Sequence, residues 1–379
     1  MRFLYLLFLF TITSYSFSQD ITSNTFGKGI SILARDSSFS LKFGARFQTL
    51  YEATYTEDSK NYTEQLSIRR WRLKFDGYVY NPRLVYKIEI GLSNRDIGDQ
   101  QPRIILDAVL KYHFNKNWTL WFGQTKLPGN RERVISSQKL QFVDRSNVNA
   151  RFNLDRDVGI QLHHEDMIGN GIFKQILSIS MGEGRNPTSP NVGGYNYTGR
   201  LEYLPFGEFT SNGDYFGSDL KRETTPKLSI GATYDYNDGA SRSRGQLGSD
   251  VLGAQNNLIN NNLSTVIVDA MFKLKGLSIM SEYIDRQGED NIAGFGTGTG
   301  FVAQAGYLFK NNFEIAGRFS TIKPDDLNYS AINEEKEYTL GLSRYIVGHS
   351  LKVQTDFSYD DFPLAENQFK FRFQVELAF

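Results

Sequence analysis

The sequence ends with FKFRFQVELAF, residues 369–379, which alternates without a break between two kinds of side chain. One face of an extended strand would carry Phe369, Phe371, Phe373, Val375, Leu377 and Phe379. The other face would carry Lys370, Arg372, Gln374, Glu376 and Ala378. Chain ends usually fray, so a strand this regular at the terminus predicts that another strand pairs with it.

The same alternation recurs along most of the chain. Its first occurrence is SFSLKFGARFQTLYEATY, residues 38–55, which is much longer than the roughly 5 or 6 residues of an ordinary strand. We count about sixteen candidate strands by this period-two pattern. The pattern is weaker in some of them, among them residues 277–286 and 301–309.

The connections between these strands alternate between short and long. Short ones include Asn81-Pro82 and FNKN at 114–117, whereas long polar ones include TEDSKNYTEQ at 56–65 and the Asn-rich 237–263. This alternation is typical of a membrane barrel with tight periplasmic turns and extended external loops. The connection at 205–226 falls in the set that should be short, but it is long and breaks the rule.

A soluble β-sandwich would also alternate, but its strands would be shorter and interrupted by more turns. In an outer-membrane barrel the apolar face meets lipid, the polar face meets a wet lumen, and strands of about 9 to 11 residues cross the bilayer. Unpaired backbone groups in lipid cost several kcal/mol each, so the sheet must close and the last strand must pair with the first. We therefore predict an all-β fold, a 16-stranded antiparallel transmembrane β-barrel.

The N-terminus predicts export from the cytoplasm. MRFLYLLFLFTITSYSFSQ has a charge, an apolar run and small residues before a cleavage point near Gln19, as a signal peptide does. A membrane anchor is the alternative, but the run is shorter than the roughly 20 apolar residues of a spanning helix. The predicted organisation is a signal peptide at 1–19, a short periplasmic segment at 20–37 and the barrel at 38–379. The chain has no cysteine, so it offers neither a disulfide nor a lipidated thiol.

The overall charge is balanced, with 42 Lys plus Arg and 42 Asp plus Glu, so nothing favours nucleic acid as a partner. Sorting the charges by face places a set of bases on one wall of the lumen: Lys42, Arg46, Arg70, Arg72, Lys74, Lys87, Lys111, Lys370 and Arg372. Inward acids are spread around the wall: Glu52, Asp76, Glu89, Asp107, Asp235, Asp269, Asp356 and Glu376. A run of bases attracts anions electrostatically, although each base could instead pair with a neighbouring acid.

The third long connection, residues 127–156, is too long for an ordinary loop and carries apolar residues with which to pack. We expect it to fold into the lumen and to place Arg131, Arg133 and Lys139 at a constriction. His163 and His164 are adjacent on a strand and point to opposite faces, so we expect no metal site there. No arrangement of catalytic residues stands out, and we expect neither an enzyme nor a cofactor.

Three stretches resemble the phosphate- and pyrophosphate-selective outer-membrane porins of the porin O and P type: RRWRLKFDGYVY, GQTKLPGNRERVISSQKLQFVDRS and GDYFGSDLKRETTPKLSIGATYDYNDGA. The resemblance spans about residues 38–379. It implies a trimeric sixteen-stranded porin in the outer membrane of a Gram-negative bacterium, with an infolded third loop, an anion-binding lumen and passive diffusion of small anions such as phosphate or polyphosphate. Membrane lipid and lipopolysaccharide would surround the barrel. Two alternatives stay open: a general or sugar-accepting porin with weak charge preference, and a barrel that acts as a surface adhesin or receptor.

Overall fold

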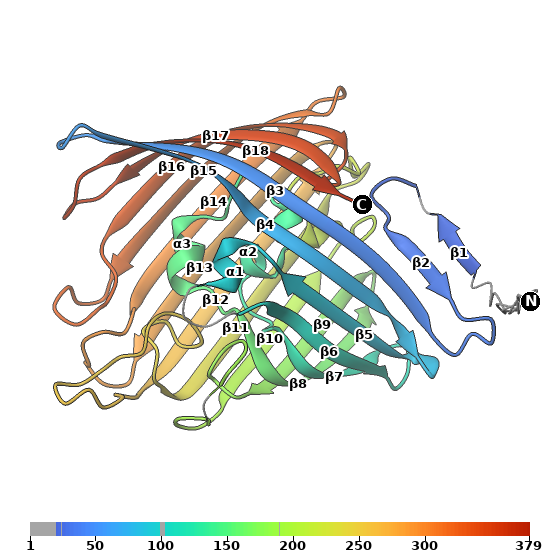
Figure 1. Cartoon of the computed structure of the whole chain (residues 1–379), viewed down its shortest axis with the longest axis horizontal. Helices are drawn as coiled ribbons and strands as arrows, with labels where there is room; N and C mark the ends of the chain where they lie inside the picture. The colour runs from blue at the N-terminus through green and yellow to red at the C-terminus, as the bar shows by residue number, and fades with distance from the viewer. Residues whose placement is uncertain (1–19, 24, 99–102, 189) are drawn as a thin grey trace, which may run out of the picture.

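The computed structural model describes residues 20–23, 25–98, 103–188 and 190–379, so the predicted signal peptide lies outside the described residues. Within those ranges, no helix combines the length and the apolar character that crossing a membrane requires. One antiparallel sheet curls until its last strand, β18, pairs with β3 (Figure 1). The predicted closed barrel of sixteen strands, β3 to β18, is confirmed.

The barrel strands are β3 (Ser40–Thr56), β4 (Asn61–Val79), β5 (Asn81–Gly91), β6 (Ile105–His113), β7 (Trp118–Lys126), β8 (Arg156–Ile168), β9 (Gly171–Ser180), β10 (Asn196–Leu204), β11 (Lys227–Ala240), β12 (Asn261–Leu274), β13 (Leu277–Gly288), β14 (Gly298–Leu308), β15 (Phe313–Pro324), β16 (Glu335–Val347), β17 (Leu351–Asp361) and β18 (Gln368–Ala378). Two short strands, β1 (Asp20–Ser23) and β2 (Ile30–Leu33), precede them. The helical segments are α1 (Asn94–Ile97), α2 (Arg131–Val134), η1 (Ser137–Lys139), α3 (Asn147–Phe152) and η2 (Gly213–Tyr215).

Closure of the barrel rests on the terminal strand. In the β18–β3 register Phe373 lies beside Tyr51, Arg372 beside Glu52 and Phe371 beside Ala53. The aromatic residues of β18 therefore share the outer face with those of β3, and Arg372 faces inward. This pairing satisfies the backbone groups that a free sheet edge would leave unpaired in lipid.

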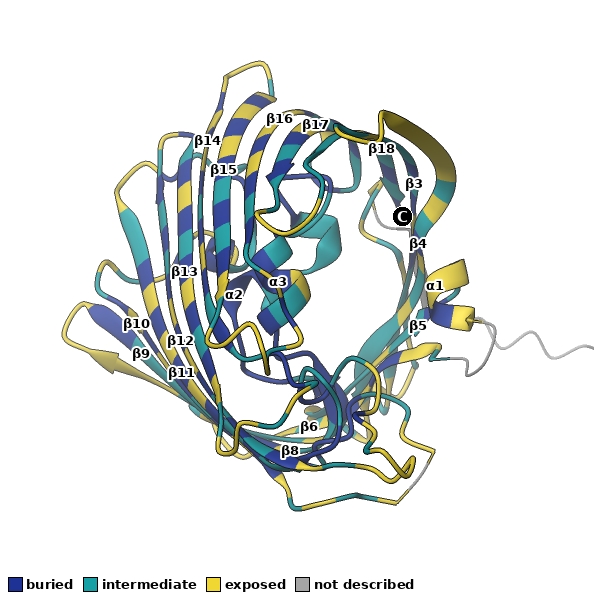
Figure 2. Cartoon of the chain, turned by 90° about the vertical axis from the view of Figure 1, so that its left-hand side faces the viewer, coloured by how far each residue is buried: buried dark blue, intermediate teal, exposed yellow. Residues whose placement is uncertain are grey.

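The two faces of the sheet differ in burial as a barrel requires. Along β16 buried and exposed residues alternate, and Figure 2 shows the resulting bands on β14 to β16. Outward residues such as Leu340 are exposed in the isolated chain, whereas the inward residues on either side of it, Thr339 and Gly341, are buried. The apolar outer face thus suits contact with lipid.

The first external connection is shorter than the sequence indicated. Residues 56–65 were expected to form a loop, but β3 continues to Thr56 and β4 begins at Asn61. The reason is that the β3–β4 ladder extends to the pair Thr56 and Asn61 at the very end of the hairpin. At the other end of β3, β2 pairs with residues 40–43, beyond the point where β18 ends, and β1 pairs with β2. We propose that residues 20–37 lie in the periplasm, as this end of the barrel does.

A β-bulge interrupts the alternation in β4. Arg70 pairs with Gln48 and Ile68 pairs with Thr49, so Arg69 is the extra residue. Bulges change which face a side chain reaches. Ile68 and Trp71 therefore both point outward, although three positions separate them, and the two arginines lie side by side on the inner wall.

The orientation of the outer face predicts the effect of a charge placed in the bilayer. Leu340 and Leu364 are equally exposed, at 63% and 65%, but Leu340 lies in the middle of β16 and Leu364 in the loop before β18. Leu340→Arg should reduce the free energy of unfolding by about 2–4 kcal/mol, because a mid-bilayer arginine costs that much. Leu364→Arg should change it by less than about 0.5 kcal/mol. Urea titration in lipid vesicles measures both, and equal effects would contradict the assigned orientation.

Candidate functional site

The third long connection, residues 127–155 between β7 and β8, lies inside the barrel (Figure 2). Its apolar side chains Val148 and Phe152 form one buried cluster with Ile267, Ile284 and Val302, which point inward from β12, β13 and β14. A second cluster joins Ile135 and Leu140 of the connection to Met271 and Met280. The connection, hereafter the inner loop, is therefore packed on one half of the barrel wall.

Two inward glycines let the inner loop approach this wall closely. A Cβ at Gly300 would lie 2.8 Å from Val148 and 2.9 Å from the Phe152 ring, and one at Gly341 would lie 2.9 Å from the Phe142 ring. Cβ contacts this short do not occur in real proteins. The absence of side chains at these positions makes room for the aromatic rings of the loop.

Arg131 anchors the start of the inner loop. Its Nε donates to Asp269 at 2.7 Å, and its Nη2 donates to Ser229 at 2.8 Å and lies 3.3 Å from Glu202. Its side chain is 0% exposed. Arg131 was expected to line the pore, but the structure places it between the loop and the wall, where a solute does not reach it.

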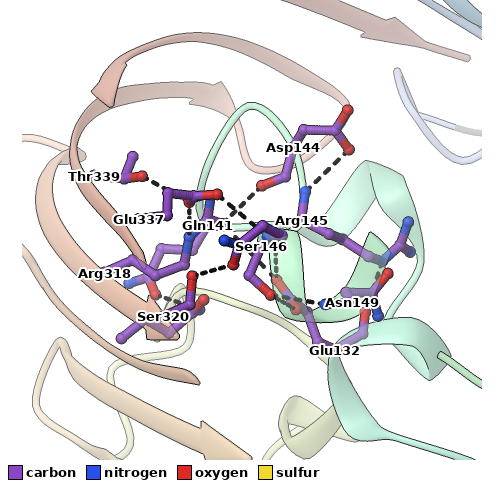
Figure 3. Close-up of polar contacts among 12 residues, drawn as sticks. Glu132, Gln141, Asp144, Arg145, Ser146, Asn149, Arg318, Ser320, Glu337 and Thr339 are labelled. Carbon is purple, nitrogen blue, oxygen red and sulfur yellow. Dashed lines mark hydrogen bonds and ion pairs between the residues drawn. The ribbon is translucent and has the colours of Figure 1, made fainter. Parts of the chain in front are cut away.

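A second polar network holds the middle of the loop (Figure 3). The guanidinium of Arg318 on β15 donates to Glu337 at 2.6 Å and to the carbonyl oxygen of Asp144 at 2.9 Å. Glu132 accepts hydrogen bonds from the backbone and the hydroxyl of Ser146, at 2.9 and 2.6 Å. Every charge buried here has a partner, as stability in a low dielectric requires.

Asp144 also reaches the opposite wall. Its carboxylate accepts from Arg69 Nε at 3.0 Å and from Arg70 Nη2 at 2.7 Å, both on β4. Burial would raise the pKa of Asp144, but the charges of Arg70 and Arg69 hold it well below its ordinary value. Nearby, Arg46 on β3 donates to the Ser137 hydroxyl at 2.8 Å. The inner loop therefore spans the lumen from β12–β16 to β3–β4 and narrows it.

The connection at 205–226 enters the barrel from the end opposite to the one at which the inner loop begins. Lys273 on β12 donates to the carbonyl oxygens of Gly213, Phe216 and Ser218 at 2.7 to 2.9 Å. Gly217 donates to the carbonyl of Lys139 at 2.8 Å, and the Lys139 ammonium lies 3.6 Å from the centre of the Phe216 ring. The connection at 205–226, which Lys273 holds in place, therefore fixes Lys139 of the inner loop.

Lys139 lies near bases on the wall formed by β4 to β6. Burial, followed by the charges of Lys74 and Lys87, lowers the pKa of Lys139 to about 8. The side chain of Lys74 is 49% exposed and that of Lys87 is 26% exposed. Next to them, the Lys111 ammonium lies 3.5 Å from the centre of the Trp121 ring. This group, Lys74, Lys87, Lys111 and Lys139, is hereafter the lysine group.

Most of the bases predicted to line the lumen are paired with acids. The pairs are Arg46 with Glu376, Arg70 with Asp144, Arg72 with Asp96, Lys74 with Asp76, Arg133 with Asp155, Lys370 with Asp360 and Arg372 with Asp356. Lys42 and Lys139 have no ion pair among the described residues. Lys42 lies near the end of β3 where β2 is attached, so among the predicted bases Lys139 is the one on the inner loop without an ion pair in the described structure.

Sequence reasoning missed Arg69 and a set of arginines near the external loops. Arg69 was assigned no role because strict alternation turns it outward, although the change of phase between Ile68 and Trp71 signals the bulge. The external loops contribute the set, Arg103, Arg242 and Arg244, and Arg151 of the inner loop lies near Arg244. Burial and then Arg242 lower the pKa of Arg103, and burial, Arg151 and Arg133 lower that of Arg244. These loops have no periodicity from which the clustering could have been read.

His163 and His164, which are adjacent on β8, lie on opposite faces of the sheet. His163 stacks on Trp121 inside the barrel and His164 stacks on Trp118 outside, each with ring centroids 4.1 Å apart. Across the described ranges, no group of three or more His, Asp or Glu residues is arranged to hold a metal ion.

A closed sixteen-stranded barrel narrowed by an infolded third loop is the architecture of an outer-membrane porin, a channel integral to the outer membrane of Gram-negative bacteria. The sequence model of the phosphate-selective porin O and P family matches residues 41–362. The chain therefore belongs to this family, as the sequence resemblance predicted. Among curated protein sequences, none matches significantly.

Solved porin structures share the fold. The anion-selective porin of Comamonas acidovorans has a TM-score of 0.58 at 10% identity, over 90% of this chain and all (100%) of that one. The outer-membrane channel DcaP of Acinetobacter baumannii also has a TM-score of 0.58, at 12% identity over 92% and 99% of the two chains. OmpT of Vibrio cholerae in its trimer form has a TM-score of 0.51 at 14% identity, over 89% and 99%.

The position of Asp144 predicts a change in selectivity. Asp144→Asn leaves Arg69 and Arg70 without a carboxylate, while the Arg318 contact to the backbone still holds the loop. The chloride-to-potassium permeability ratio should rise at least about twofold, because the one carboxylate that Arg69 and Arg70 share is lost and the net positive charge there rises by one. Reversal potentials in planar bilayers measure this ratio. Asp58→Asn, in the first external turn, is the control, and a ratio in Asp144→Asn equal to that of the control would contradict the placement of Asp144.

Proposed function

We propose that this porin allows passive diffusion of small anions, with phosphate or polyphosphate the solutes that its family suggests. The observation that carries the proposal is the lysine group, in which Lys139 has no carboxylate partner among the described residues and lies close to Lys74 and Lys87. Lys74 pairs with Asp76, and Lys87 pairs with Asp107 and Glu89, so the excess positive charge of the group comes from Lys139 and Lys111, which have no ion pair among the described residues. An excess positive charge in a narrowed lumen attracts a passing anion and repels a cation.

The external mouth supports the same direction of selectivity. After burial, Arg242 lowers the pKa of Arg103 and Arg151 lowers that of Arg244. Arg242 and Arg151 are paired with Asp250 and Glu335, whereas Arg103 and Arg244 have no ion pair in the described part of the chain. A basic mouth raises the local concentration of anions and lowers the barrier to their approach. The porin of Comamonas acidovorans, which shares the fold, is anion-selective, and this is consistent with the proposal.

One observation favours a second candidate, a general porin with weak charge preference. The arginines of the inner wall are largely compensated, for instance Arg372 by Asp356 at 2.6 Å and Arg46 by Glu376 at 3.3 Å. A wall of paired charges orients polar solutes without strongly favouring one sign. In this alternative the lysine group would contribute little to permeation.

We further propose that the protein acts as a homotrimer surrounded by outer-membrane lipid and lipopolysaccharide. The trimer form described for OmpT of Vibrio cholerae supports the assembly. The apolar outer face provides a surface for both lipid and neighbouring copies, and the acidic external residues Asp325, Asp326 and Glu334 line one hollow at the rim. Light scattering of the detergent-extracted protein tests the trimer.

Reversal potentials in a KCl gradient separate the candidate functions. Preference for chloride, together with a reduction of the chloride current by millimolar inorganic phosphate, supports the first. Equal permeability of the two ions would favour the general porin, and preference for potassium would refute anion selectivity. A folded barrel without conductance would leave the role of surface adhesin or receptor.

The pKa of Lys139 predicts a pH dependence. Because that pKa is about 8, Lys139 is mostly charged at pH 7 and mostly neutral at pH 9.5. The chloride-to-potassium permeability ratio should therefore fall across this interval. In Lys139→Gln the ratio should be low and should lack this step, and in Lys139→Arg it should remain high throughout. A fall in Lys139→Gln as steep as in the unaltered protein would show that other groups cause it.

A further inference from the structure

Three basic residues lie around the turn between β14 and β15 at the periplasmic end of the barrel. Arg222, from the connection at 205–226, donates to the carbonyl of Phe309 at 2.7 Å and to Asn312 Oδ1 at 2.9 Å. The guanidinium of Arg344 on β16 lies 4.6 Å from the centre of the Phe313 ring. Lys310 lies in the same turn, between Phe309 and Asn312, and is exposed. These three residues, hereafter the basic triad, surround the turn between β14 and β15.

The charge of the basic triad is not compensated within the described chain. None of its three members has a carboxylate within ion-pair distance there. The nearest acids along the sequence are turned inward: Glu223 accepts from the Thr210 backbone at 2.6 Å, and Glu314 accepts from Tyr345 and Gln141. These acids therefore do not neutralise the positive charge at this place.

The residues around the triad indicate its depth in the membrane. Tyr307, Phe309 and Phe313 are exposed on the outer face at the ends of β14 and β15. Aromatic residues in this position form the girdle that marks the boundary between hydrocarbon and headgroups. Above them, Ile315 and Leu342 provide an exposed apolar surface. The triad thus lies at the height of lipid phosphates, with a surface for acyl chains beside it.

We propose that the basic triad binds the phosphate of a glycerophospholipid in the periplasmic leaflet. Arginine presents two parallel N–H groups that match phosphate oxygens, and an arginine on the lipid-facing surface is costly unless it reaches the interface. Arg344 lies three residues before the end of β16 at Val347, so its side chain reaches the interface. The acyl chains lie along Phe313, Ile315 and Leu342.

A neighbouring copy of the chain is the other possible partner for this surface. Such a copy would have to place an acidic side chain at the triad. Lipid is favoured because phosphate is present along the whole periplasmic leaflet. The experiment below separates the two, since loss of a contact between copies changes the oligomeric state whereas loss of a lipid site does not.

The test is the binding of phosphatidylglycerol to the purified full-length barrel, followed by native mass spectrometry. The unaltered protein should bind phosphatidylglycerol about tenfold more tightly than diacylglycerol with the same chains. R222Q/K310Q/R344Q should lose this difference. Lys116→Gln is the matched control, because Lys116 is also exposed in a periplasmic turn, the one between β6 and β7, and has no ion pair within the described ranges. It should keep the difference.

Folding of each variant is checked by the change of its electrophoretic mobility on heating. Should the triple variant not fold, Lys310→Gln alone provides the measurement, since the Lys310 side chain has no hydrogen bond to lose in the described structure, and a two- to threefold loss of affinity is expected. Unchanged affinity in a folded variant would overturn the proposal. So would displacement of the lipid by equimolar inorganic phosphate, or an altered oligomeric state with unchanged lipid binding.

Discussion

The pairing of β18 with β3 is the interaction on which the rest of the structure depends. In lipid, the backbone N–H and C=O groups of an open sheet edge would have no partner, so the sheet must close. Closure gives every strand one wet face and one lipid face, and period-two alternation then sorts the side chains. The same pairing places Arg372 beside Glu52 and brings charges from the two ends of the chain to one lumen.

A second constraint acts inside the barrel. The inward residues Ile267, Met280 and Val302 make part of an otherwise polar wall apolar, and the inner loop covers it. This burial, with the anchors Arg131 and Arg318, fixes a loop that would otherwise be free in a wide lumen. Where the loop is held decides which charges enter the lumen, because it brings Asp144 to Arg70 of β4 and Lys139 to Phe216.

The electrostatics of the lumen depend more on which charged side chains are paired with each other than on how many charged residues the chain has. Closely paired arginines stiffen the wall and bind the loop, and they leave little net field. Lys139 departs from this rule, since it is held by Phe216 and Gly217 and not by a carboxylate. Selectivity in such a lumen depends on a small number of uncompensated charges. On the outside of the barrel, the basic triad is likewise not compensated by carboxylates, and we propose that it binds lipid phosphate.

The sequence by itself determined the strands, the closure by residues 369–379 and the family, because these depend on patterns along the chain. It also placed Arg70, Arg72 and Lys74 on strand β4. It did not place Arg131, which is buried under the loop, or Arg69, which a bulge turns inward. The weak alternation at 277–286 and 301–309 had a meaning that only the tertiary structure supplied: Met280, Ile284 and Val302 are inward and apolar because the inner loop packs on them. Contacts between distant segments decide which charges are compensated, and no local pattern encodes them.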